Sequence, residues 1–275
     1  MDTQETIIKK YINLKDLKSD GAFKVRQVRD LQITELTDEF WLVIACDSDG
    51  GIGPKELDSF YSPAYDLGRF GARVPIMEIL ASGAHPFSVI DVLAVEMDPT
   101  GKEVIKGVKD EAAYAGITCD KSITGSTEDN VKTLQTGIGV VVLGFVEKKD
   151  FRPGRSLDGD IVLCIGYPKS APEFKLHYSD PDIADPKLIR LLSNIEFVHD
   201  ILPVGSKGIA HEFLQMAKSA GLEGYYTDSL SVDIHKSGGP SACCLVSLPA
   251  SYFNELKDLT NKPVLLVGEL RKQDL

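Results

Sequence analysis

Three acidic residues in the first half of this 275-residue chain stand in or beside apolar runs. Asp49 follows the apolar run 41–46, Glu78 has apolar residues on both sides, and Asp91 interrupts the apolar run 87–95. A carboxylate is costly to bury unless it is paired, hydrogen-bonded or bound to a cation. The pattern therefore indicates a cation site. Two simpler explanations stay open, because Glu78 can mark the solvent edge of an amphipathic helix and Asp91 can accept a structural hydrogen bond from a loop amide.

A glycine-containing loop begins at the first of these acids. Asp49 is followed by Gly50, Gly51 and Gly53, and then by Lys55. Glycines let the backbone come close to a ligand, its exposed amides can hold phosphate oxygens, and a lysine offsets their charge. A plain turn between a strand and a loop explains the same residues, because glycine and aspartate are ordinary turn residues.

A second polar turn combines Gly125, Ser126, Thr127 and Glu128. Its oxygen atoms are ligands of the kind that Mg²⁺ takes together with substrate phosphates. A polar turn or helix cap explains the same composition.

A third segment in the second half consists of Gly205, Ser206, Lys207 and Gly208, and it leads into a predicted helix that ends near Gly221. The free amides and the dipole of a helix start attract anions. This segment is therefore a candidate phosphate or acceptor site, although many helix starts bind nothing.

The elements that must position these residues follow from the apolar patterns. In the first half we expect strands within 23–36, at 40–46, 87–96 and 137–146, a helix from residue 71 or 75 to 83, and a helix from about 102 to 116. In the second half we expect strands at 161–166, 242–248 and 264–268, a helix at 187–194, and a helix after residue 206. The alternation predicts two α/β or α+β halves. The charged connector 148–155 divides them into domains 1–148 and 149–275.

The overall composition narrows the possible partners. A net charge of −11 argues against nucleic acid and anionic membranes as partners. The chain has no run of about 20 apolar residues and no signal-peptide pattern, and its five cysteines contain no C-x-x-C pair, so we expect a cytoplasmic protein with reduced thiols. The five histidines lack zinc-ligand spacing, and neither a Walker A nor a protein-kinase motif is present.

In order along the chain, these segments resemble the superfamily of aminoimidazole ribonucleotide synthetase, thiamine-monophosphate kinase, selenophosphate synthetase and a hydrogenase-maturation protein. Residues 49–55 are similar to a D-G-V-G-T-K loop, and 78–86 to N-D-L-x-x-x-G-A-x-P. Residues 125–128 resemble G-G-[DE]-T, and Gly159-Asp160 resembles the P-G-D that opens the second domain. Within the superfamily, the length and the segment 203–208 most resemble α-ribazole kinases, which act in cobalamin salvage.

The resemblance implies a two-domain fold whose N-terminal sheet pairs with a second copy in a homodimer, and ATP with Mg²⁺ as cofactors. It implies a set of acids that hold Mg²⁺ directly or through water: Asp30, Asp49, Glu78, Asp91 and Glu128. Lys55 and the amides of 50–53 are expected to offset phosphate charge, and 205–208 to position the acceptor. Asp200 or His199 is the candidate for orienting the reacting hydroxyl.

The resulting hypothesis is a Mg²⁺-ATP-dependent kinase that phosphorylates a hydroxyl of a small nucleoside-like molecule, with α-ribazole as the best match. One alternative is an ATP-dependent cyclo-ligase or synthetase of the aminoimidazole ribonucleotide synthetase type. The other is a non-catalytic nucleotide-binding maturation protein, an alternative that the altered motifs, such as Pro54 in place of the loop threonine, keep open.

Overall fold

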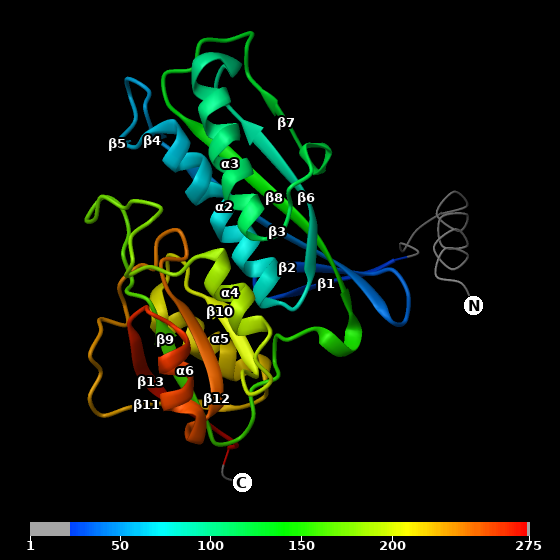
Figure 1. Cartoon of the computed structure of the whole chain (residues 1–275), viewed down its shortest axis with the longest axis vertical. Coiled ribbons are helices and arrows are strands. Elements are labelled where there is room, and N and C mark those ends of the chain that lie inside the picture. Colours follow the sequence, from blue (N-terminus) through cyan, green and yellow to red (C-terminus); the bar gives the residue numbers. More distant parts are fainter. Residues whose placement is uncertain (1–22, 274–275) are drawn as a thin grey trace.

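The computed structural model describes residues 23–273. The start of the expected first domain, residues 1–22, and the end of the second, residues 274–275, lie outside the described residues. Two sheets, each with helices packed on it, stack along the long axis of the molecule (Figure 1). This arrangement confirms the predicted mixture of helices and strands. The domain boundary at 148/149 stays a prediction.

The first sheet has six strands in the order β1-β2-β3-β8-β6-β7, all antiparallel to their neighbours except the parallel pair β6 and β7. The strands are β1 (Lys24–Val28), β2 (Leu31–Glu35), β3 (Phe40–Gly50), β6 (His85–Leu93), β7 (Ile123–Thr127) and β8 (Gly137–Glu147). Helices α2 (Ala64–Ala81) and α3 (Lys102–Tyr114) pack together beside this sheet (Figure 1). A two-stranded parallel ribbon, β4 (Ile52–Gly53) and β5 (Phe60–Tyr61), lies before α2.

Strand β3 shows why the acids at its end face the helices. Its side chains alternate between the two faces of the sheet. Trp41, Val43 and Ala45 are buried on the helix-covered face. The same alternation places Asp47 and Asp49 on that face, at the end of the strand. The strand is therefore longer than the predicted 40–46 and carries the acids with it.

The second sheet has five antiparallel strands in the order β10-β12-β9-β13-β11. They are β9 (Asp160–Ile165), β10 (Asp200–Pro203), β11 (Glu223–Tyr226), β12 (Cys244–Pro249) and β13 (Val264–Arg271). The helices of this half are α4 (Pro186–Ser193), α5 (Gly208–Ser219) and α6 (Phe253–Leu259). Short helical turns at Met97–Gly101, Asp120–Ser122, Lys148–Asp150 and Ala250–Tyr252 complete the described chain.

Helix α2 is the element that connects the two halves. It contacts β3 and α3 in its own half, and α4 and β10 in the other. The predicted helix start at residue 71 or 75 was wrong, because α2 begins at Ala64 and contains Pro75. Ala72 and Ile76 beside this proline are fully buried, and this packing outweighs the cost of a proline inside a helix.

Gly107 allows α2 and α3 to pack closely. A Cβ atom on Gly107 would lie 2.1 Å from the Tyr65 carbonyl oxygen, and one on Gly68 would lie 2.1 Å from the Val104 carbonyl oxygen. We therefore expect Gly107→Ala to lower the free energy of unfolding by about 1–3 kcal/mol, measured by urea denaturation. The exposed change Ala113→Ser on the same helix is the control, with an expected effect within about 0.5 kcal/mol. Equal stability of Gly107→Ala and wild type would show that the helices separate at no cost.

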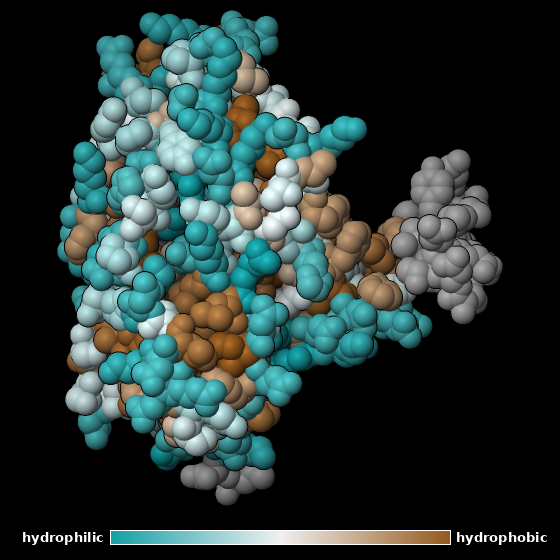
Figure 2. Space-filling model, in the orientation of Figure 1, coloured by the Kyte–Doolittle hydropathy of each residue, from teal (hydrophilic) through white to brown (hydrophobic). Residues whose placement is uncertain are grey.

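The face seen in Figure 2 is mainly hydrophilic, its largest hydrophobic patch lies over the second half, and further hydrophobic residues show along the right side of the first half. Within residues 23–273, no helix combines the length and the apolar character that crossing a membrane requires. All five cysteines are free thiols, as expected from the sequence.

Candidate functional site

A cavity of about 560 Å³ lies between the two halves of the molecule. Most of its walls come from β3, α2 and the β1–β2 turn of the first half, and from α5 and two loops of the second half. The polar residues in its lining are Asp30, Cys46, Asp47, Ser48, Asp49, Ser62, Glu78, Ser170, Ser206, Lys207, His211, Glu212 and Ser237. Residues that are more than 150 positions apart in the chain therefore meet in one site.

The cavity is open along the end of β3 because the neighbouring strand stops short. Strand β2 pairs with β3 only as far as Ile44, so the segment from Ala45 to Gly50 has a free edge on that side. Asp47 and Asp49 lie on this segment and line the cavity. Asp47 was not among the predicted site residues, although its position two residues before Asp49 in a strand was the signal that could have identified it.

Five carboxylates in the cavity carry more negative charge than their surroundings neutralise. Burial, and then the charge of Asp47, raises the pKa of Asp49 to about 6. Burial, and then the charges of Asp30, Asp47 and Glu212, raises the pKa of Glu78 to about 8. Burial also raises the pKa of Glu212 to about 7 and raises that of Asp47. Such a group of carboxylates is a favourable environment for a cation.

One carboxylate oxygen of this group also indicates a binding site for a cation or a hydrogen-bond donor. Glu78 Oε2 is buried and has no hydrogen-bond partner among residues 23–273. A buried acceptor without a partner is costly, and a bound cation or ligand donor would remove that cost. Glu78 therefore faces the cavity with an unused coordination position.

The donor set fits a metal that is held mainly by phosphate. In the described part of the chain, no group of three or more His, Cys, Asp or Glu side chains is arranged to hold a metal ion. Mg²⁺ usually takes only one or two carboxylates and completes its octahedron with water and substrate phosphates. Asp30, Asp49 and Glu78 can supply such carboxylates from three different elements.

The wall from the second half contains residues of the segment that was predicted to bind an anion. Gly205, Ser206 and Lys207 line the cavity, and Gly208 is the first residue of α5. Gly208 has φ +81°, and a Cβ atom there would lie 2.6 Å from the Lys236 carbonyl oxygen. Glycine is therefore required at this position, and the amides of the helix start are close to the cavity.

Glu212 lies one turn further along α5 and also lines the cavity. No local pattern in the sequence identified it. It reaches the first-half acids only because α5 packs against the junction.

The remainder of the cavity is apolar. Ile52, Phe60, Leu67, Phe70, Val74, Phe174 and Leu176 line it. Three phenylalanines beside a polar end suit a planar ring with polar substituents.

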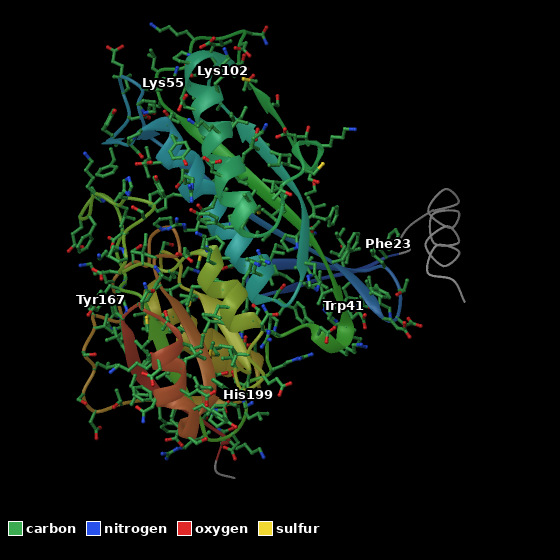
Figure 3. All side chains as sticks on the ribbon, viewed as in Figure 1. Phe23, Trp41, Lys55, Lys102, Tyr167 and His199 are labelled. Carbon is green, nitrogen blue, oxygen red and sulfur yellow. The ribbon has the colours of Figure 1, made fainter. Side chains whose placement is uncertain are left out.

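Several predicted site residues lie outside the lining of this cavity. They are Gly50, Gly51, Gly53, Lys55, Asp91, Gly125, Ser126, Thr127, Glu128, His199, Asp200 and Gly208. Figure 3 shows Lys55 near the far end of the first half and His199 near the bottom of the second, so these two residues cannot share one site. The roles predicted for the others in metal or phosphate binding stay predictions.

Lys55 and Glu128 have local partners instead. Lys55 forms an ion pair with Glu96. Burial acts to raise the pKa of Glu96, but hydrogen bonds from Lys55 and Thr100 outweigh burial and lower this pKa to about 2. Glu128 Oε1 accepts hydrogen bonds from the Asn130 amide at 2.7 Å and the Val131 amide at 3.1 Å. The Glu128 side chain therefore stabilises its own turn, which agrees with the explanation of this segment as a polar turn.

Asp91 lies two strands away from Asp47 on the same face of the sheet, because both pair with Val140 of β8. Burial raises the pKa of Asp91 to about 6, although Lys109 opposes this. A Cβ atom on Gly125 would lie 1.9 Å from Asp91 Oδ1, so Gly125 makes room for this carboxylate. Residues 125–127 of the predicted polar turn belong to strand β7.

The two candidates for orienting the hydroxyl are both engaged elsewhere. His199 Nδ1 lies 2.8 Å from Asp160 Oδ2. Asp200 is fully buried and forms an ion pair with Arg29. Neither side chain is in contact with the cavity.

Comparison with known proteins agrees with this architecture. Residues 30–146 match the family model described as AIR synthase related protein, N-terminal domain. No curated protein matches the sequence.

Three solved structures cover most of the chain. Thiamine-monophosphate kinase from Stenotrophomonas maltophilia K279a is 15% identical with a TM-score of 0.60, and the match covers 98% of this chain and 95% of that one. HypE of E. coli, a hydrogenase maturation protein, is 17% identical with a TM-score of 0.63, covering 84% and 80%. AaThiL complexed with AMPPCP and TMP is 15% identical with a TM-score of 0.58, covering 100% and 94%. At these identities the likeness shows the fold. Residues 30–146 therefore resemble the N-terminal domain of AIR synthase related proteins, and the chain has the AIR synthase-like fold.

Proposed function

We propose that the protein is a Mg²⁺-ATP-dependent kinase that transfers a phosphoryl group to a hydroxyl of a small nucleoside-like molecule. The observation that carries this proposal is the cavity between the halves, which combines crowded carboxylates, a glycine-containing helix start and an apolar end. The solved structures of thiamine-monophosphate kinase and of AaThiL with the ATP analogue AMPPCP support ATP as the phosphoryl donor.

Each wall of the cavity has a separate task in this proposal. Mg²⁺, when bound, neutralises and aligns the phosphates. One or two of Asp49, Asp30 and Glu78 would hold it, and the amides of Ser206 and Lys207 with the Lys207 side chain would hold phosphate oxygens. The phenylalanine-lined end would take the ring of the acceptor.

Glu212 is suited to receive the proton of the acceptor hydroxyl, because its pKa is about 7 and its side chain lines the cavity. The hydroxyl oxygen would form a bond to the γ-phosphorus while the bond from that phosphorus to the bridging oxygen of ADP breaks. The hydroxyl proton would pass to the Glu212 carboxylate. This role replaces the one predicted for Asp200 or His199.

The charges of the lining favour an uncharged acceptor. Among the described residues, Lys207 is the only lysine or arginine in the lining of this cavity, against five carboxylates. An acceptor with a phosphate of its own would add negative charge where little is neutralised. This favours a neutral nucleoside such as α-ribazole over a nucleotide.

The outer face of the first sheet supports the proposed homodimer. Val25, Phe87, Val92 and Phe145 on this sheet are between 41% and 55% exposed, and the rings of Phe87 and Phe145 stack with centroids 4.6 Å apart. Exposed apolar groups on a sheet face are favourable to bury against a second copy. Analytical ultracentrifugation would test this association, and a monomer at micromolar concentration would contradict it.

The kinase proposal is tested by incubating the protein with Mg²⁺-ATP and a panel of acceptors, with products identified by mass spectrometry. The panel contains α-ribazole, thiamine monophosphate and formylglycinamidine ribonucleotide. We expect phosphorylated α-ribazole with ADP and no free phosphate. Asp49→Asn is the negative control and is expected to lower turnover by about 10–100-fold.

Two other outcomes would replace the proposal. ADP with free phosphate and a dehydrated acceptor would indicate a synthetase. Tight ATP binding without turnover on any acceptor would favour a nucleotide-binding maturation protein. The likeness to HypE, a hydrogenase maturation protein, is the reason to test for this function.

A further inference from the structure

The turn between β1 and β2 carries Asp30 into the cavity in an unusual conformation. Val28 pairs with Leu31, so the hairpin closes on only two residues, Arg29 and Asp30. Arg29 has φ +54°. A residue other than glycine in this region costs about 1–2 kcal/mol, so contacts elsewhere must compensate.

The compensating contacts come from the other half of the molecule. Arg29 Nη1 donates to Asp200 Oδ1 at 3.0 Å, and Nη2 donates to Asp200 Oδ2 at 2.5 Å. Nη2 also donates to Ser219 Oγ at 2.7 Å. The side chains of Arg29 and Asp200 are 6% and 0% exposed. A buried, two-pronged pair of this kind has a fixed geometry as well as attraction.

The remaining capacity of the Asp200 carboxylate is also used. Its Oδ1 accepts the Ile201 amide at 2.8 Å, and its Oδ2 accepts the Gly154 amide at 3.0 Å. A carboxylate has about four lone-pair positions, and four donors occupy them. Asp200 therefore has no acceptor position left for a substrate hydroxyl.

Asp30 depends on this arrangement for its place in the cavity. It is the other residue of the two-residue turn, it is exposed, and it lines the cavity. It lies near enough to Glu78 and Glu212 to repel their charges. Like charges push Asp30 away from the cavity, so an attractive contact must hold the turn in place.

We propose that Arg29 and Asp200 form a positioning pair, which holds the tip of the β1–β2 hairpin against the second half and thereby keeps the Asp30 carboxylate at the cavity. The pair touches no substrate and acts through Asp30. The placement of the hairpin stands on the contacts alone, and only its consequence for nucleotide binding rests on the proposed function.

The test compares Asp200→Asn with wild type by two readouts. Asn is nearly the same size but removes the charge that holds Arg29. Hydrogen exchange of the amides in 24–35 should become at least about 10-fold faster, because the hairpin tip is released. Calorimetric binding of Mn²⁺-ATP should weaken by about 10–100-fold. Arg29→Lys, which keeps the charge but loses the two-pronged contact, should show a smaller change in both readouts.

A double-mutant cycle with Asp30→Asn separates positioning from general damage. If Asp200 acts through Asp30, Asp200→Asn should weaken binding by no more than about 2-fold when Asp30 is already Asn. Glu35→Gln removes an ion pair with Arg26 elsewhere in the same hairpin and is the matched control, expected to change neither readout at the turn.

Equal weakening in both backgrounds would overturn the proposal, because Asp200 would then act without Asp30. Unchanged exchange in the hairpin of Asp200→Asn would overturn it as well. If wild type binds no Mn²⁺-ATP, the proposed function fails, and the exchange measurement alone decides whether the pair holds the hairpin. If Asp200→Asn does not fold, Arg29→Lys supplies the same comparison.

Discussion

Replacing Glu111 by alanine is expected to lower the free energy of unfolding by about 3–5 kcal/mol. Glu111 on α3 is fully buried and accepts hydrogen bonds from Arg69 Nε and Arg73 Nε of α2, both at 2.6 Å. Both guanidinium groups are almost completely buried. The alanine variant therefore leaves two buried positive charges without their shared carboxylate.

The same change should also loosen the contact between the halves. Arg73 Nη2 donates to the Tyr178 carbonyl oxygen at 3.1 Å and Nη1 to the Ala184 carbonyl oxygen at 3.4 Å, both in the second half. Glu111 holds the arginine that makes these contacts. Urea unfolding followed by circular dichroism measures the loss of stability, and a changed slope with denaturant would indicate that the halves no longer unfold together.

An exposed ion pair between α3 and the turn Asp120–Ser122 provides the control. Lys109 and Asp120 are 2.7 Å apart with 43% and 83% of their side chains exposed. Asp120→Asn is expected to leave the unfolding midpoint unchanged, because exposed pairs contribute little. A loss below about 1 kcal/mol for Glu111→Ala would contradict the expectation, since it would mean that both arginines reach water.

Replacing Glu78 by glutamine is expected to stabilise the protein at high pH and to have little effect at low pH. The pKa of Glu78 is about 8 in the folded protein, against an ordinary 4.5, because burial and the neighbouring carboxylates disfavour its charge. The folded state therefore binds this proton more tightly than the unfolded state does. Its contribution to stability is fully present below pH 4.5 and is lost as pH rises to 8.

The loss for one such group is up to about 1.4 kcal/mol per pH unit between these two values. Glutamine carries no charge at any pH, so the advantage of Glu78→Gln over wild type should grow to about 2–4 kcal/mol at pH 8.5. Urea denaturation at pH 5, 7 and 8.5 without divalent cations measures this difference. Glu103→Gln on the exposed side of α3 is the matched control and should follow wild type at every pH. A Glu78→Gln advantage that is the same at pH 5 and pH 8.5 would show that Glu78 is not held in a carboxylate cluster.

The local patterns of the sequence were sufficient for the type of most elements. Continuous apolar runs identified β3 and β8, and the helical spacing after residue 100 identified α3, because these patterns depend only on local burial. Element ends were less accurate. Helix α2 starts at Ala64 because its packing against both halves is worth more than local propensity, and no local pattern records that packing.

The site divides in the same way. Asp49 and Glu78 were identified in the sequence because an acid beside an apolar run is unusual in a short window, and both line the cavity. Glu212 gave no such signal, and Asp200 looked available for catalysis although Arg29 occupies its carboxylate. The ion pair between residues 29 and 200 and the shared cavity of 78 and 212 form only when the two halves pack together. Local periodicity thus predicted which side chains face inward, whereas the packing of the two halves determined which of them share a cavity, because distances between remote segments depend on the whole fold.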